Sequence, residues 1–193
     1  MRKQKGFSLI ELLIVVAIIL IIAAIAIPSL LRARISANNS AAASSIRTIN
    51  TAEVSYITNF SQAGFSNSLE NLGPGAAKVD CTVALNVTAI SACLIDGVLG
   101  CTSDPGPCNK SGYAYFIMGS VGALVALPPT PNPDYMVSAT PVSFGLSGDK
   151  NLCSIPDAVV RTQNPPVAGA TPPAAPVAST SACATGLWVP IGQ

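Results

Sequence analysis

The first strong pattern along the chain is a run of apolar residues near its start. Residues 7–27 read FSLIELLIVVAIILIIAAIAI, and Glu11 is the only ionisable side chain among them. About 20 apolar residues are enough for a helix to cross the hydrocarbon core of a bilayer. The run therefore predicts a membrane-spanning helix.

Beyond Pro28 the pattern becomes amphipathic, because apolar residues recur at intervals close to 3.6 and so share one face of a helix. They are Leu31, Ile35, Ala42, Ile46, Ile49, Tyr56 and Phe60. Together the two patterns predict one helix from Phe7 to about Asn59, about 80 Å long. A head of this size cannot cover such a helix, so its first half must be buried by lipid or by other subunits.

Pro28 lies inside the predicted helix. A proline lacks a backbone donor and clashes with the preceding turn, so a kink is expected near Ala24. The alternative is that Pro28 only marks the point where the chain leaves the bilayer.

After residue 60 the apolar segments become short and are separated by Gly, Pro, Asn and Ser. The run from Gly64 to Gly75 predicts a loop, and residues 90–99 could form a short helix. Strands are expected at 113–119, 135–141, 151–155 and 158–161. Three to four antiparallel strands packed on the C-terminal half of one long helix make an α+β fold.

These patterns divide the chain into five parts. We expect a leader, a membrane-spanning and assembly half of the helix, an amphipathic half, a globular head with the sheet, and a Pro/Ala/Ser-rich tail. Their bounds are 1–6, 7–27, 28–60, 61–163 and 164–193. Residues 164–182 of the tail have little to bury, so we expect them to be extended or mobile.

The charges are unevenly placed. Arg2, Lys3 and Lys5 precede the apolar run, and the next basic residue is Arg32. By the positive-inside rule this cluster keeps the leader in the cytoplasm and sends the rest of the chain outward. Without the leader, seven basic and nine acidic groups remain. Such a surface lacks the clustered cations of a general nucleic-acid binder.

The six cysteines lie in one region, between residues 81 and 183. An even number of clustered cysteines predicts disulfides and an oxidising, extracytoplasmic location. Many pairings are open. One of them, the nearest-neighbour scheme, joins Cys81 to Cys93, Cys101 to Cys108, and Cys153 to Cys183. Zinc is a competing explanation, but the chain has neither histidine nor a Cys-x-x-Cys pair.

Candidate catalytic chemistry is sparse. The absence of histidine excludes His-based acid–base catalysis and Ser-His or Cys-His pairs. We find no Gly-rich phosphate loop, paired-carboxylate motif or EF-hand pattern. We therefore expect no enzyme activity, no cofactor and no metal.

Glu11 needs an explanation, because a carboxylate at membrane depth costs about 2.5–3.5 kcal/mol and usually has a partner. Cleavage between Gly6 and Phe7 would create an amino terminus one helical turn away, which could pair with the carboxylate of a neighbouring subunit. Alternatively, Glu11 lies among lipid headgroups. A cleaved secretory signal ending near Ala24 to Ala26 is a further alternative, but the apolar run is too long for it.

The segment KGFSLIELLIVVAIILIIAAIAIP resembles the class III signal and N-terminal helix of type IV prepilins and type II secretion pseudopilins. In that family a prepilin peptidase cuts after the glycine, here Gly6, and methylates the new first residue, here Phe7. The matching carboxylate, Glu11, is thought to neutralise the amine of an adjacent subunit. The helix can also unwind locally at the proline, here Pro28, when the filament packs.

The resemblance is closest over residues 5–60 and weaker over 112–161. Major pseudopilins bind calcium in a loop of the head, and Asp134, Asp149 and Asp157 are candidate ligands here. Solvated loop acids are the simpler interpretation, because these positions do not match the family's ligands one by one.

The resemblance implies a structural subunit that forms a homopolymer, the filament of a type IV pilus. Its partners would be the prepilin peptidase and the pilus assembly machinery, first in the bacterial inner membrane and then in a periplasmic or extracellular filament. The alternatives are a major pseudopilin of a type II secretion system, a minor tip subunit, or a membrane-tethered extracellular binding module. Whether the filament serves adhesion, motility or DNA uptake is left open.

Overall fold

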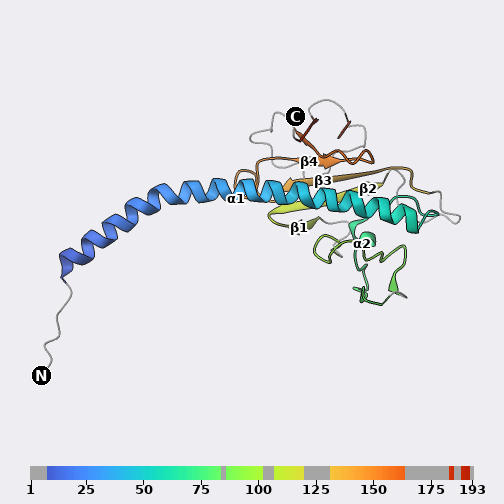
Figure 1. The fold of residues 1–193 in the computed structure, drawn as a ribbon, viewed down its shortest axis with the longest axis horizontal. Helices are drawn as coiled ribbons and strands as arrows, with labels where there is room; N and C mark the ends of the chain where they lie inside the picture. Colours follow the sequence, from blue (N-terminus) through green and yellow to red (C-terminus); the bar gives the residue numbers. More distant parts are fainter. Residues whose placement is uncertain are drawn as a thin grey trace, which may run out of the picture.

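The structure, a computed structural model, describes residues 8–83, 86–101, 107–119, 131–163, 183–184 and 188–191. The expected leader, with Gly6 and Phe7, lies outside these residues, as does most of the expected tail. One long helix and one antiparallel sheet dominate the described part (Figure 1). The fold is therefore α+β, as the patterns predicted.

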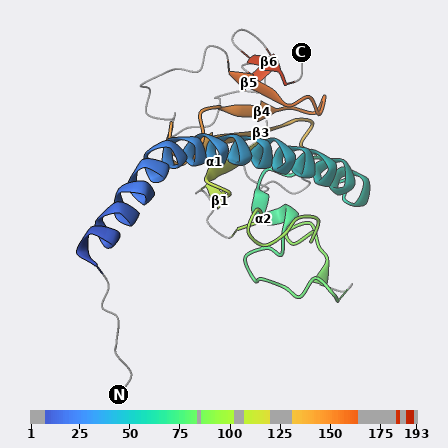
Figure 2. The same cartoon turned by 60° about the vertical axis from the view of Figure 1, so that its left-hand side comes forward.

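Helix α1 (Leu9–Asn59) has 51 residues and stays helical through Pro28. Its C-terminal half lies along the sheet, while its N-terminal half projects beyond the head and curves away from it (Figures 1 and 2). The first buried residue along α1 is Ala42. The head therefore covers less than half of the helix.

The sheet is a meander in which each strand pairs antiparallel with the next along the chain. In the register of the central strands, Ala139 lies opposite both Tyr115 and Leu152. The strands of the described residues are β1 (Cys108–Lys110), β2 (Tyr113–Gly119), β3 (Tyr135–Pro141), β4 (Leu152–Ser154), β5 (Arg161–Gln163) and β6 (Trp188–Pro190).

The main core lies between α1 and one face of the sheet. Ile46, Ile49 and Tyr56 of the helix pack against alternate residues of the strands, which are Tyr113, Tyr115, Tyr135, Val137, Ala139 and Leu152. Successive strand residues point to opposite faces. Met136 and Cys153 therefore face the other side, where they form a small second core with Cys183. Both faces of β3 are thus covered, and all its residues are buried.

The structure corrects three expectations about the head. Residues 90–99 are not a helix, because the amides of Ala92, Cys93 and Leu94 bond to carbonyls of residues 71–73 rather than to their own segment. The loop expected over 64–75 contains a short helix, α2 (Leu69–Leu72), capped by the Ser68 hydroxyl. The fourth expected strand begins late, at Arg161, because residues 155–158 form a turn and Ala158 has a φ of 58°.

The number of strands also exceeds the three to four expected. Strands β1 and β6 have only three residues each, too few for a periodic pattern to be seen in the sequence. Strand β6 pairs with β5, so residues 188–190, which follow the stretch expected to be mobile, return to the sheet.

Three disulfides join Cys81 to Cys93, Cys101 to Cys108, and Cys153 to Cys183. The first two hold the segment between α2 and β2. The third is buried on the face of the sheet opposite α1.

Candidate functional site

The candidate site is the projecting half of α1, which exposes its apolar side chains on every side. From Leu9 to Leu31, every large hydrophobic side chain is at least 46% exposed. Burying apolar surface is worth roughly 25 cal/mol per Å². A surface of this kind is stable only when lipid or protein covers it.

By length and composition α1 can cross a membrane, with a mean hydropathy of 3.3 in its most apolar 18-residue window. None of that window is buried within the chain. This distinguishes α1 from the core helix of a soluble domain, which would be buried inside its own fold.

Glu11 lies in the first turn of this helix. Its side chain is exposed, like those around it. A carboxylate near a helix N-terminus is stabilised by the exposed backbone amides there. A single chain holds no amino terminus of a neighbour, so the pairing suggested by the sequence stays a prediction.

The projecting helix is joined to the head at two adjacent asparagines. The side-chain amide of Asn38 donates to the carbonyl of Ser147 at 2.7 Å. That of Asn39 donates to the carboxylate of Asp149 at 2.6 Å, and its oxygen accepts from the Tyr113 hydroxyl at 2.6 Å. The start of β2 and the β3–β4 loop therefore both form hydrogen bonds with α1 at the point where the helix leaves the head.

Two glycines allow this close approach. A Cβ at Gly148 would lie 2.4 Å from the Tyr113 hydroxyl oxygen, and Gly112 has a φ of +75° against Asn38 and Ser147. Positive φ is readily adopted only by glycine. The joint is therefore a packed contact between three segments rather than a flexible linker.

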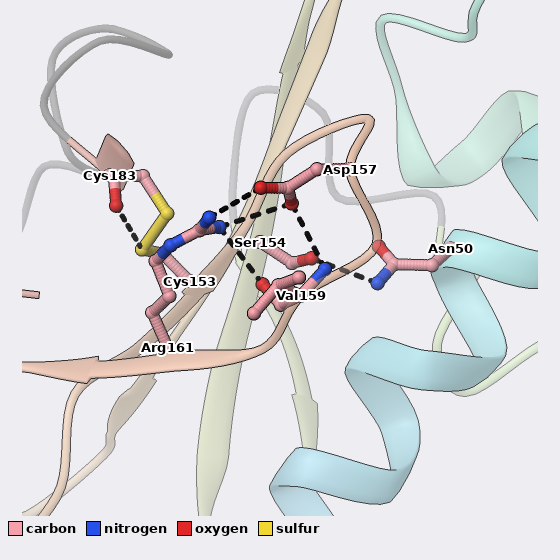
Figure 3. The surroundings of a disulfide bond; sticks show 7 residues. All are labelled: Asn50, Cys153, Ser154, Asp157, Val159, Arg161 and Cys183. Carbon is pink, nitrogen blue, oxygen red and sulfur yellow. Dashed lines mark hydrogen bonds and ion pairs between the residues drawn. A yellow bond between two sulfur atoms is a disulfide. The ribbon is translucent and has the colours of Figure 1, made fainter. Parts of the chain in front are cut away.

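A second polar contact ties the middle of α1 to the turn between β4 and β5. As Figure 3 shows, Asn50 points from the helix toward this turn and donates to the Ser154 hydroxyl at 2.9 Å. Its oxygen accepts from the Tyr135 hydroxyl at 3.1 Å. On the far side of the turn, Asp157 forms an ion pair with Arg161.

Glu53 is the most unusual residue of the interface, because it is a fully buried carboxyl. One oxygen accepts from the backbone amide of Ser66 at 2.8 Å, and the other has no hydrogen-bond partner in the part of the chain that the structure describes. Burial raises its pKa to about 8, and the Ser66 amide only partly offsets this.

The acids considered for calcium have other partners or no cluster around them. Asp149 accepts from Asn39, and Asp157 is paired with Arg161. Within the described residues no three acids or cysteines gather as metal ligands. The structure therefore does not bring Asp134, Asp149 and Asp157 together as a site.

Sequence reasoning missed the joint at Asn38 and Asn39 and the burial of Glu53. A signal for Glu53 was present, because it continues the helical spacing of Ile46 and Ile49 toward Tyr56 on the buried face. No local signal marks the asparagines, since their partners lie 74 to 110 residues away in the chain.

Comparison with known proteins points in the same direction as this geometry. Residues 1–27 match the family described as the prokaryotic N-terminal methylation motif. Over 104 residues the chain is 39% identical to the type IV wide pilus major component PilA4 of Thermus thermophilus, a match that covers 53% of this chain and 79% of the relative. No solved structure matches the chain.

The matched motif includes residues 9–27 of the projecting apolar helix, and the match to the relative spans many more residues than the motif. The long helix, the antiparallel sheet packed on its second half and the disulfides of the head complete the same picture. This chain belongs to the type IV pilin family.

Proposed function

We propose that this pilin is the repeating subunit of a type IV pilus. Its leader, residues 1–6, is removed by a prepilin peptidase between Gly6 and Phe7, and Phe7 is methylated. The processed subunits then leave the inner membrane and pack through residues 7–27, while the heads face outward. The observation that carries the proposal is the exposed apolar surface between Leu9 and Leu31.

That surface fits two environments in turn. In the precursor, lipid covers it, because the run is long enough to span a bilayer core. In the filament, the same side chains of neighbouring helices cover one another. No further binding surface is needed for either state, so one segment serves first as an anchor and then as the contact of the polymer.

Glu11 gives the packing its register. Inside a bundle of apolar helices, an unpaired carboxylate is costly. The amine of Phe7 in an adjacent subunit supplies the matching charge. The pair forms only when neighbouring helices are offset by a defined distance, so the register with the pair formed is favoured over others.

Pro28 also contributes to the packing of the helices in the filament. It has no N–H to donate to the carbonyl one turn earlier, so the helix is weakest at this point. Local unwinding here lets neighbouring helices adjust to one another without disturbing the head, whose first side-chain hydrogen bond with α1 is at Asn38.

The relative PilA4 is named as a major component of a wide pilus. We favour the corresponding role, a major pilin, over that of a major pseudopilin of a type II secretion system. The disulfide-bonded segment between α2 and β2 adds to the head beyond a minimal pseudopilin. The energy for assembly comes from the machinery, and the subunit itself has a structural role.

Mass spectrometry of the protein recovered from cells tests the processing step. We expect an intact mass and an N-terminal peptide that begin at methylated Phe7. A chain that still begins at Met1 would leave a membrane-tethered binding module, and one that begins near Ile27 would indicate a secreted head.

A pair of matched variants tests assembly. Glu11→Gln removes the charge that the packed helices would bury, and it is expected to reduce strongly the filaments seen by electron microscopy. Glu70→Gln, the same change in the head, is expected to leave them unchanged. Equal filament yields for both variants would refute the role given to Glu11. Filaments purified from the cell surface, with this chain as main component, would distinguish a pilus from a periplasmic pseudopilus.

A further inference from the structure

A short stretch of α1 lies between the apolar span and the residues that are buried in the head. It is the neck, residues 28–37, with the sequence PSLLRARISA. None of its residues is buried, and the first side-chain hydrogen bond between α1 and the head comes at Asn38. Its charged residues are two arginines, Arg32 and Arg34, and it contains no acid.

Neither arginine has a partner of its own chain in the part that the structure describes. The ion pairs there are Lys110 with Asp96 and Arg161 with Asp157. The residues one helical turn from Arg32 and Arg34 are apolar or uncharged, so no carboxylate on α1 can reach them. Both guanidinium groups are therefore free to bind an external anion.

The two arginines point in nearly opposite directions. Residues two apart on a helix are separated by about 200° around its axis. A single protein surface on one side of the helix would meet only one of them. A medium that surrounds the helix, such as a layer of lipid headgroups, meets both.

The height of the neck above the membrane matches that layer. If the span ends at Ile27 and α1 stands upright, the Cα atoms of Arg32 and Arg34 lie roughly 7 to 11 Å beyond the hydrocarbon core. The headgroup region is roughly 5 to 8 Å thick on each side. Helical side chains tilt toward the N-terminus, here toward the membrane, so both guanidinium groups reach back into this region.

We propose that Arg32 and Arg34 form a phosphate-binding collar that holds the unassembled subunit at a fixed depth against the outward-facing leaflet of the membrane. The ligand is the phosphate of phospholipid headgroups, which a guanidinium binds through paired hydrogen bonds. The exposed side chains of Leu30 and Leu31 assist by contacting the acyl boundary. This inference rests on the proposed function, since it requires the membrane-inserted precursor.

Solid-state NMR on the full chain in phosphatidylglycerol-containing vesicles tests the collar. Arginine is labelled with carbon-13 at the guanidinium, and dephasing by phosphorus-31 reports which groups lie within a few ångströms of phosphate. An Arg2→Gln background removes the leader arginine, which belongs to the opposite leaflet. Arg32, Arg34, Arg47 and Arg161 remain. We expect two of these four signals to dephase.

Variants assign the signals. Arg32→Gln with Arg34→Gln should abolish the dephasing, and Arg47→Gln, on the same helix but beside the head, should leave it unchanged. Dephasing that survives the double variant would overturn the collar.

Membrane insertion is measured on the same vesicles by alkaline carbonate washing. A chain that the wash releases would refute the proposed precursor together with the collar. A chain that the wash retains but whose arginines show no phosphorus contact would refute the collar alone.

Discussion

At the scale of single residues, Glu53 is the group that most strongly links this fold to pH. Its carboxyl is buried against Ser66, and burial raises its pKa from 4.5 to about 8. The pKa of the nearby Tyr135 is raised as well. Burial of the tyrosine is the larger cause, and the negative charge of ionised Glu53 adds to it. A buried acid of this kind is most stable with its proton in place.

The folding free energy should therefore depend on pH between about 4.5 and 8. In that window the folded chain holds a proton that the unfolded chain has released, so stability falls as pH rises. The total loss is about 4–5 kcal/mol. Urea denaturation of the detergent-solubilised chain, followed by Trp188 emission, measures it.

Glu53→Gln should flatten this dependence and make the protein more stable than the wild type at pH 9, because the amide stays neutral. Glu70→Gln is the control, since Glu70 lies at the start of α2 rather than in the core. If stability still falls steeply with rising pH in Glu53→Gln, the pH dependence must come from another group.

The joint between neck and head offers a second test at this scale. Gly148→Ala would place a methyl group against the Tyr113 ring, 2.4 Å from its hydroxyl oxygen. Overpacking of this kind costs about 1–3 kcal/mol. Gly97→Ala is matched to it, because its nearest neighbour would lie at an ordinary 3.7 Å. Equal melting temperatures for the two variants would show that the contact between Gly148 and Tyr113 can rearrange at little cost.

At the scale of elements, the Cys153–Cys183 disulfide holds the end of the chain on the sheet. It closes a loop of about 30 residues, which the chain-entropy model values at about 4 kcal/mol. Strand β6 has only three residues and pairs with another short strand, β5. Such a pair is marginal unless something else fixes it.

Replacing both cysteines by alanine should therefore release β6. We expect amide hydrogens of β5 and β6 to lose protection in hydrogen exchange, while those of β2 and β3 keep it. The matched variant removes Cys81 and Cys93, which lie in the segment before β1, and should leave β5 and β6 unchanged. Retained protection of β6 without the Cys153–Cys183 bond would show that strand pairing alone suffices.

Elements with a long periodic pattern were predictable. The helix, expected from Phe7 to Asn59, is found at Leu9–Asn59, and β2 and β3 have the expected bounds. The helix expected over residues 90–99 was wrong because backbone bonds to residues 71–73 override a local pattern. Short edge strands were missed for the same reason: their pairing is decided by contacts distant in sequence.

The candidate site shows the same division. The exposed apolar surface of α1 could be predicted, since a run of this length cannot be covered by a small head. The grip on Asn38 and Asn39 could not, because asparagine is common in loops and on helix surfaces alike, and only the folded β3–β4 loop makes these two special.

At the scale of the whole molecule, the head and the projecting helix should be separable. A chain that begins at Arg32 keeps all the buried residues of α1 and loses the apolar surface of the span. We expect it to be a soluble monomer in sedimentation velocity, with the melting temperature of the head in the full chain. Filaments formed by this fragment would show that the head carries its own assembly contacts.

The way in which α1 packs on the sheet also determines how the subunit responds to force. The helix lies along the sheet, gripped at Asn38, tied again at Asn50 and buried between and beyond these points. Tension in a filament would enter through the N-terminal half and run along the helix axis. It would then load these contacts in shear, all together, rather than peel them apart one after another. The force that the head withstands should therefore grow with the length of α1 that is packed on the sheet.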